Sequence, residues 1–206
     1  INALDKDNGP VGNWTTIKGC WFGAYDPAKS NVVFDAQPPL NGLVPDQAQC
    51  GNSWWNERIV REVPAGLSPG KVPVKVVRND EATATFAAGF TVNNNAVEPG
   101  ICKIFPATGQ RDDPATVTGH TFTTKAVGDQ VTFTEIGSLT ALPVSFYPDP
   151  QPAWTDQKIA IRVPDAAAIA PNEVRVVKGI QSSNSLPYIV TAASACATSC
   201  QFGNDA

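Results

Sequence analysis

The chain has 206 residues, of which 42% are hydrophobic and 17% charged, and its formal net charge at pH 7 is −4. This composition provides enough apolar surface for one or two packed cores and lacks the basic balance that binding of DNA or RNA requires. No apolar run reaches the length of about 18 residues that a membrane span needs. We therefore expect neither a nucleic-acid partner nor a membrane span in this segment.

Short β-type segments separated by turns run through the first half of the chain. Residues 15–17 are β-branched, and residues 58–63 and 72–76 alternate apolar and polar side chains with a period of two. Turn-forming residues at 7–9, 69–70 and 79–80 separate these segments. This pattern predicts an antiparallel β-sandwich.

The second half repeats this pattern at a distance of 100 residues, with apolar and turn residues in the same order. The matched pairs include Trp54 with Trp154, Ile59 with Ile159, Val63 with Val163 and Val74 with Val174. A two-residue slip aligns Phe90 with Tyr188 in the last segment. We interpret the sequence as a tandem duplication: an all-β chain of two β-sandwiches, at residues 1–95 and 96–193, joined by a short linker and followed by a cysteine-containing tail at 194–206.

Five cysteines in a chain of low charge favour disulfides and an oxidising compartment. Under the 100-residue shift, Cys20 falls on His120 and Cys50 on Pro150, so the second half lacks both cysteines at once. This joint loss predicts a Cys20–Cys50 disulfide. The remaining cysteines would form one pair and leave one thiol over: Cys102 with a tail cysteine, or Cys196 with Cys200.

The sequence carries no recognisable catalytic pattern. His120 is the single histidine, and we interpret it as structural. The paired carboxylates lie at expected turns, where Asp serves local hydrogen bonding. We expect no enzyme activity, no cofactor and no metal site.

Three tryptophans have no counterpart in the second half: Trp14, Trp21 and Trp55. Exposed aromatic rings stack on sugars or become buried at protein interfaces, so these three are our candidate contact surface. Asn13-Trp14-Thr15 is also a glycosylation sequon, which makes Asn13 a possible modification site. The chain has no Met, and we expect it to be a processed piece of a longer protein.

Each half resembles an IPT/TIG domain, an immunoglobulin-like fold found in many bacterial surface proteins. The residues that carry the resemblance are Gly9–Gly12, Thr16–Gly19, Phe22-Gly23, Val63-Pro64 and Pro69–Val72, and the second half departs from it at Gly109–Asp112 and Thr123. Expected disulfides, low charge, the absence of a catalytic pattern and tandem repetition favour an extracellular or cell-surface structural or adhesion module with protein–protein contacts or self-assembly. Its short polar linker at 93–99 contains a proline and should allow limited swing, which predicts a stiff two-domain segment. The alternative is a carbohydrate-binding accessory domain pair of a secreted enzyme that binds cell-surface glycans.

Overall fold

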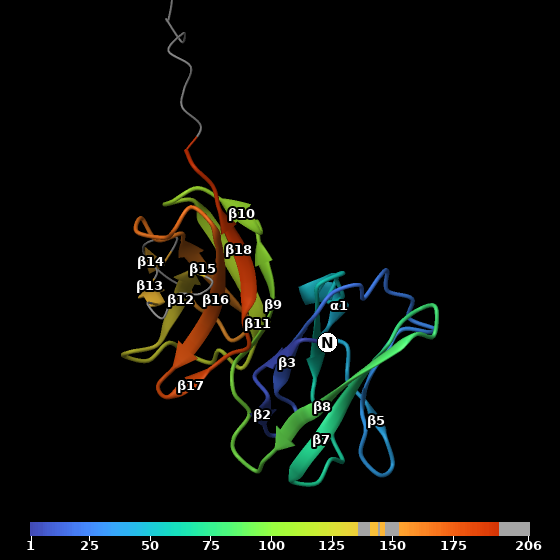
Figure 1. Cartoon of the computed structure of the whole chain (residues 1–206). Helices are drawn as coiled ribbons and strands as arrows, with labels where there is room; N and C mark the ends of the chain where they lie inside the picture. The colour runs from blue at the N-terminus through green and yellow to red at the C-terminus, as the bar shows by residue number, and fades with distance from the viewer. Residues whose placement is uncertain (136–140, 144, 147–152, 194–206) are drawn as a thin grey trace, which may run out of the picture.

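A computed structural model describes residues 1–135, 141–143, 145–146 and 153–193. Two β-sandwiches lie side by side, and the short helix α1 (Gln47–Cys50) lies at the border between them (Figure 1). The described helices include none long and apolar enough to span a membrane. The prediction of an all-β chain with two immunoglobulin-like β-sandwiches is confirmed.

The first sandwich consists of two sheets from residues 3–92. One has the strand order β1-β3-β6, formed by β1 (Ala3–Asp5), β3 (Trp14–Lys18) and β6 (Arg58–Glu62). The other has the order β2-β8-β7-β4-β5, formed by β2 (Asn8–Gly9), β4 (Asn31–Phe34), β5 (Leu40–Asn41), β7 (Gly70–Val77) and β8 (Thr83–Val92). All pairs are antiparallel except β2 with β8.

The second sandwich uses residues 100–190. Its first sheet has the order β14-β15-β11-β9, with β9 (Gly100–Phe105), β11 (Pro114–His120), β14 (Ser145–Phe146) and β15 (Lys158–Arg162). Its second sheet has the order β10-β18-β16-β12-β13, with β10 (Thr108–Gly109), β12 (Gln130–Glu135), β13 (Ala141–Pro143), β16 (Pro171–Lys178) and β18 (Leu186–Val190). The short β17 (Gln181–Ser182) pairs with β16.

Equivalent contacts recur in the two sandwiches at a spacing of 100 residues. The Phe22 and Trp54 rings meet edge to face with centroids 6.4 Å apart, and Phe122 and Trp154 do the same at 6.4 Å. The Trp54 indole N–H donates to the Gly23 carbonyl, and the Trp154 indole donates to the Thr123 carbonyl. Both tryptophans therefore pack in the cores, as their matched positions predict.

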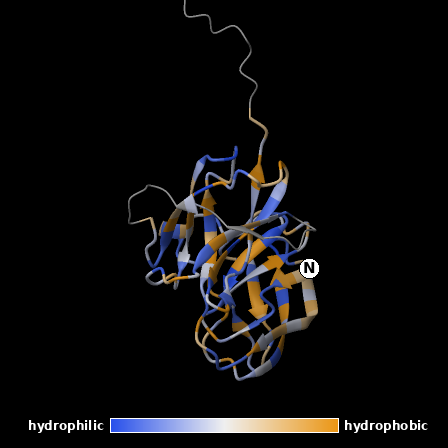
Figure 2. Cartoon of the chain, turned by 90° about the vertical axis from the view of Figure 1, so that its left-hand side faces the viewer, coloured by the Kyte–Doolittle hydropathy of each residue, from blue (hydrophilic) through white to orange (hydrophobic). Residues whose placement is uncertain are grey.

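Hydrophobic and hydrophilic residues alternate along many of the strands (Figure 2), because each sheet buries one face. The first core gathers Ile17, Phe34, Val74 and Phe90. The second core continues into the first sandwich, since Trp14, Cys50 and Val60 pack within the same buried cluster. The two sandwiches thus share buried apolar surface.

Candidate functional site: the junction of the two sandwiches

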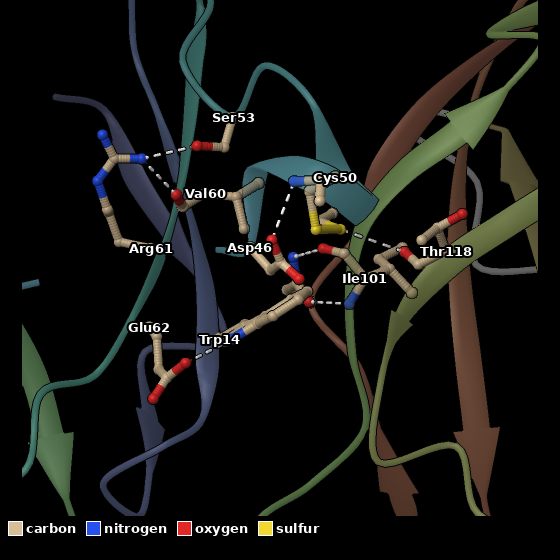
Figure 3. Close-up of a disulfide and its surroundings, with 12 residues drawn as sticks. Trp14, Asp46, Cys50, Ser53, Val60, Arg61, Glu62, Ile101 and Thr118 are labelled. Carbon is tan, nitrogen blue, oxygen red and sulfur yellow. Dashed lines mark hydrogen bonds between the residues drawn. A yellow bond between two sulfur atoms is a disulfide. The ribbon is translucent and has the colours of Figure 1, made fainter. Parts of the chain in front are cut away.

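A disulfide crosses the junction. Cys50, at the end of α1, is bonded to Cys102 on β9, with the two Cα atoms 5.4 Å apart and both residues buried (Figure 3). Helix α1 begins where the Asp46 carboxylate accepts the Ala48 N–H, and the Asp46 carbonyl accepts the Cys50 N–H at 2.8 Å. A loop of the first sandwich is therefore covalently joined to an edge strand of the second.

The predicted Cys20–Cys50 bridge is wrong, because Cys50 is bonded to Cys102 and Cys20 is an exposed free thiol. Cys102 therefore neither pairs with a tail cysteine nor stays free, while the predicted Cys196–Cys200 bridge is not tested. Aligning the two halves compares equivalent positions within each half. It could not predict a disulfide between the halves, which is what Cys50 and Cys102 form. Cys196 and Cys200 lie outside the described residues.

An aromatic pair lies next to the disulfide. The Trp14 ring stacks on the His120 ring with centroids 4.1 Å apart and planes inclined by 25°. Trp14 is only 6% exposed, and its indole N–H donates to Glu62 at 3.2 Å. Trp14 therefore makes an internal contact between the sandwiches, and its assignment to an external contact surface is wrong.

Burial lowers the pKa of His120 to about 4, because desolvation of the imidazolium outweighs the attraction of Asp156. The Nδ1 atom lies 3.1 Å from the Thr121 hydroxyl, while Nε2 is buried without a hydrogen-bond partner. His120 is therefore neutral at pH 7, and the ring that stacks on Trp14 carries no charge.

A buried polar network extends the junction along β3 and β1. The Thr16 hydroxyl donates to the Ser185 carbonyl at 3.0 Å, and the Asn184 amide donates to the Thr16 hydroxyl at 2.9 Å. The same Asn184 side chain bonds both backbone groups of Ile101 at 2.8 Å and is fully buried. Buried amides are costly unless paired, so this network holds one orientation of the sandwiches.

Asp5 forms the charged end of this network. Its carboxylate accepts hydrogen bonds from Arg175, at 2.6 Å, and from the Ser185 N–H. Burial by itself raises the pKa of Asp5, but Arg175, Ser185 and Lys18 together hold that pKa below its ordinary value. Lys18 in turn pairs with Glu173, so a second ion pair crosses the junction.

The linker is also held in place. The Asn13 side chain donates to Glu98 at 3.1 Å and accepts the Glu98 N–H at 2.8 Å, and Lys6 pairs with the same carboxylate. Asn13 is 1% exposed, so its amide nitrogen has no room for a glycan. The prediction of glycosylation at Asn13 is therefore wrong for the folded chain.

A groove of about 230 Å³ opens beside the disulfide, between the sandwiches. The Trp55 ring lines it, with the Arg58 guanidinium 4.1 Å from the ring centroid. Lys103 lines the groove from the second sandwich. The charged residues that line this groove, Arg58 and Lys103, are both cations.

The structure separates the three candidate tryptophans. Trp14 is buried in the junction, Trp55 lines the groove half-buried, and Trp21 is 73% exposed. Trp21 lines a different hollow, shared with Arg78 and Thr83. The predicted contact surface is therefore not one surface.

Sequence reasoning missed the polar network. The run Ser182-Ser183-Asn184 is typical of a turn, whereas Asn184 and Ser185 are buried against the first sandwich. A usable signal was that Asn184 and Ser185 align with Phe86 and Ala87 under the slipped shift. Within the described residues, no group of three or more His, Cys, Asp or Glu is placed to hold a metal ion.

No protein-family model and no curated protein matches the chain. Among solved structures, it is similar to the surface glycan-binding protein PbSGBP-B from Prevotella bryantii, with 12% identity, 88% of this chain and 38% of that chain covered, and a TM-score of 0.34. A gamma-CGTase from alkalophilic Bacillus clarkii has 19% identity, coverages of 94% and 26%, and a TM-score of 0.35. SGBP-B from a xyloglucan utilization locus of Bacteroides uniformis has 15% identity, coverages of 93% and 49%, and a TM-score of 0.32.

The chain spans less than half the length of each of these three solved chains. At these identities and TM-scores the similarity carries no argument about function. The fold assignment rests on the sheet order and register described above.

Proposed function

We propose that this chain is a rigid two-domain structural module of a secreted or cell-surface protein, built from two IPT/TIG-like domains and acting without catalysis. The observation that carries the proposal is the disulfide-bonded junction, which holds both sandwiches in one orientation. A buried disulfide is stable in an oxidising compartment, which supports an extracellular or cell-surface location.

The composition of the junction supports rigidity. Rotation about the linker would expose Trp14 to water and would leave Asn184 and Asp5 without their partners. Each buried polar group that loses its hydrogen bond costs about 1–3 kcal/mol. These costs add to the covalent link, so the junction works as a fixed spacer and not as a hinge.

Residual dipolar couplings in a weakly aligned sample test this proposal. We expect backbone amides in the described strands of both sandwiches to fit a single alignment tensor, because a rigid pair aligns as one body. Two different tensors in the native, oxidised chain would contradict the proposal. The Cys50→Ser/Cys102→Ser variant serves as the comparison, since it retains the polar network and loses the covalent link.

A second candidate function, carbohydrate binding, is favoured by the groove. Trp55 offers an aromatic wall, and Arg58 and Lys103 supply positive charge without a lining carboxylate. Guanidinium groups bind carboxylate in bidentate geometry. The groove therefore suits a saccharide that carries carboxylates, rather than a neutral one.

Titration with polygalacturonate, followed by Trp fluorescence, tests the second candidate. We expect a saturable change with this polyanion and none with neutral dextran, and we expect Arg58→Gln to weaken binding about tenfold, the loss of one charge-assisted hydrogen bond. Arg78→Gln is the matched control, because Arg78 lies outside the groove and its substitution removes the same charge. Equal weakening by both substitutions would indicate non-specific charge attraction and would contradict a site.

A further inference from the structure

Strand β8 leaves most of one side without a partner. Strand β2 pairs only with Thr91 and Val92 of β8, whereas β7 pairs with β8 from Thr83 onward. Within the described part of the chain, no strand pairs with the outer side of residues 83–90. Alternate residues of such an edge present N–H and C=O groups outward, ready to pair with another strand.

The other sheet edges of the described residues are short or covered. Strands β2, β5, β10 and β14 have two residues each, and β1 and β13 have three. Leu43 exchanges two backbone hydrogen bonds with Glu62 at the edge of β6. Asn184 covers the edge of β9 through both backbone groups of Ile101.

The equivalent edge in the second sandwich is blocked. Strand β18 contains Pro187, which has no N–H to donate, and the neighbouring Ser185 N–H donates to Asp5 of the first sandwich. Proline and contact with another part of the chain are two devices that protect edge strands. Strand β8 has neither of them along residues 83–86, and its bulge, a third device, lies beyond this stretch at residues 87–89.

Residues 83–90 read Thr-Ala-Thr-Phe-Ala-Ala-Gly-Phe and contain no charged residue. The side chains of Thr83, Ala84, Thr85, Ala87 and Ala88 are all exposed. Gly89, with φ of +67°, forms a bulge where a Cβ atom would lie 2.4 Å from the Val72 carbonyl oxygen. The regular part of the free edge is therefore residues 83–86, about 14 Å long at 3.4 Å per residue, and its exposed side chains are small and neutral.

We infer that β8 pairs antiparallel with β8 of a second copy of this chain about a two-fold axis. In antiparallel self-pairing, each residue of the free edge lies opposite a residue of the same edge. A strand without charge therefore places no like charges opposite each other. The two five-stranded sheets become one continuous sheet, and a two-fold axis closes the assembly at a dimer. This inference does not depend on the proposed function.

Sedimentation velocity over a micromolar concentration series tests the inference. We expect the mass to rise from 21.7 kDa toward twice that value as concentration increases. The variant Ala84→Lys/Ala88→Lys should remain monomeric, because it adds like charges to the same edge of both copies, and self-pairing would bring these edges together. Both alanines are exposed, so the monomer should keep its fold, which far-UV circular dichroism checks.

Ala126→Lys/Ala166→Lys is the matched control, because both alanines are exposed and lie in the other sandwich. It adds the same charge and should still dimerise. A wild-type chain that stays monomeric, or a dimer that survives the β8 lysines, would overturn the inference. A dimer that persists on a non-reducing denaturing gel would also overturn it, because a cysteine would then link the copies.

Hydrogen exchange gives a second readout that needs no variant. Alternate amides of residues 83–90 should exchange quickly in dilute solution and become protected at dimer concentrations. Protection elsewhere, with these amides unchanged, would place the interface on another surface and overturn the inference.

Discussion

At the residue scale, His120 shows how burial converts a titratable side chain into a neutral ring. Its imidazole stacks on Trp14, and Nε2 has no partner that could stabilise an added proton. Because the chain contains one histidine, any histidine titration can be assigned to His120. The residue therefore couples stability to pH.

We expect the folded chain to lose stability as pH falls from the unfolded pKa of 6.5 toward the folded pKa of about 4. In that interval the unfolded state binds a proton that the folded state excludes, and the loss amounts to about 3 kcal/mol at most. Above the unfolded pKa, His120 makes no pH-dependent contribution. Urea unfolding at about pH 7 and about pH 5 measures the difference.

His120→Phe is the control for this pH effect, because it keeps an aromatic ring against Trp14 and removes the titration. We expect a smaller stability loss on acidification in this variant. An unchanged loss would mean that other groups are responsible.

The cysteines and tryptophans show what the sequence could predict at this scale. Trp54 and Trp154 are core residues, as their equivalent positions indicated. Cys50 and Trp14 have no counterparts because they face the other sandwich, and contacts between two units are invisible to a comparison of each unit with the other. The lack of equivalent residues in the second half indicated that Cys50 and Trp14 have a role specific to the first half. It did not indicate that they contact Cys102 and His120.

At the element scale, β1 and β3 serve both their own sandwich and the junction. Period-two alternation predicted β6, β7, β15 and β16, because one face of each strand lies in a core. The same signal could not predict what contacts Thr16 and Lys18, since those contacts depend on how the sandwiches are oriented. Thr16 contacts Ser185, the residue before β18, and Lys18 pairs with Glu173 on β16.

The ion pair between Asp5 and Arg175 should couple these elements. We expect a double-mutant cycle with Asp5→Asn and Arg175→Gln to give a coupling of about 1–2 kcal/mol, because the Asp5 side chain is only 10% exposed. Because the pKa of Asp5 is lowered in the folded chain, the ion pair contributes its full stability at pH values above the ordinary carboxyl pKa. This stability is lost as the pH falls through the lowered pKa of Asp5. Chemical unfolding at about pH 7 measures the coupling.

The pair Arg78–Asp80 is the control cycle, because it lies on a hairpin of one sandwich and the Asp80 side chain is 53% exposed. Its coupling should stay below about 0.5 kcal/mol, as for other exposed pairs. Equal coupling in both cycles would contradict a special contribution of the junction.

At the scale of the whole molecule, two units that a sequence comparison treats as separate share one buried cluster. The short linker predicted limited swing, but the stronger constraint comes from residues far from the linker, Asp5 and Cys50 among them. Orientation between domains is set by side-chain pairs that are distant in sequence, so local patterns could not predict it.

The disulfide has a mechanical consequence for a chain under tension. Cys50 and Cys102 are 52 residues apart in sequence, and a force applied at the two ends passes directly from one cysteine to the other. Strands β6, β7 and β8 lie inside the bypassed segment. A pulled chain would therefore keep roughly 180 Å of contour length hidden, at about 3.5 Å per residue, until the bond is reduced. Single-molecule extension with and without reductant would show that difference directly.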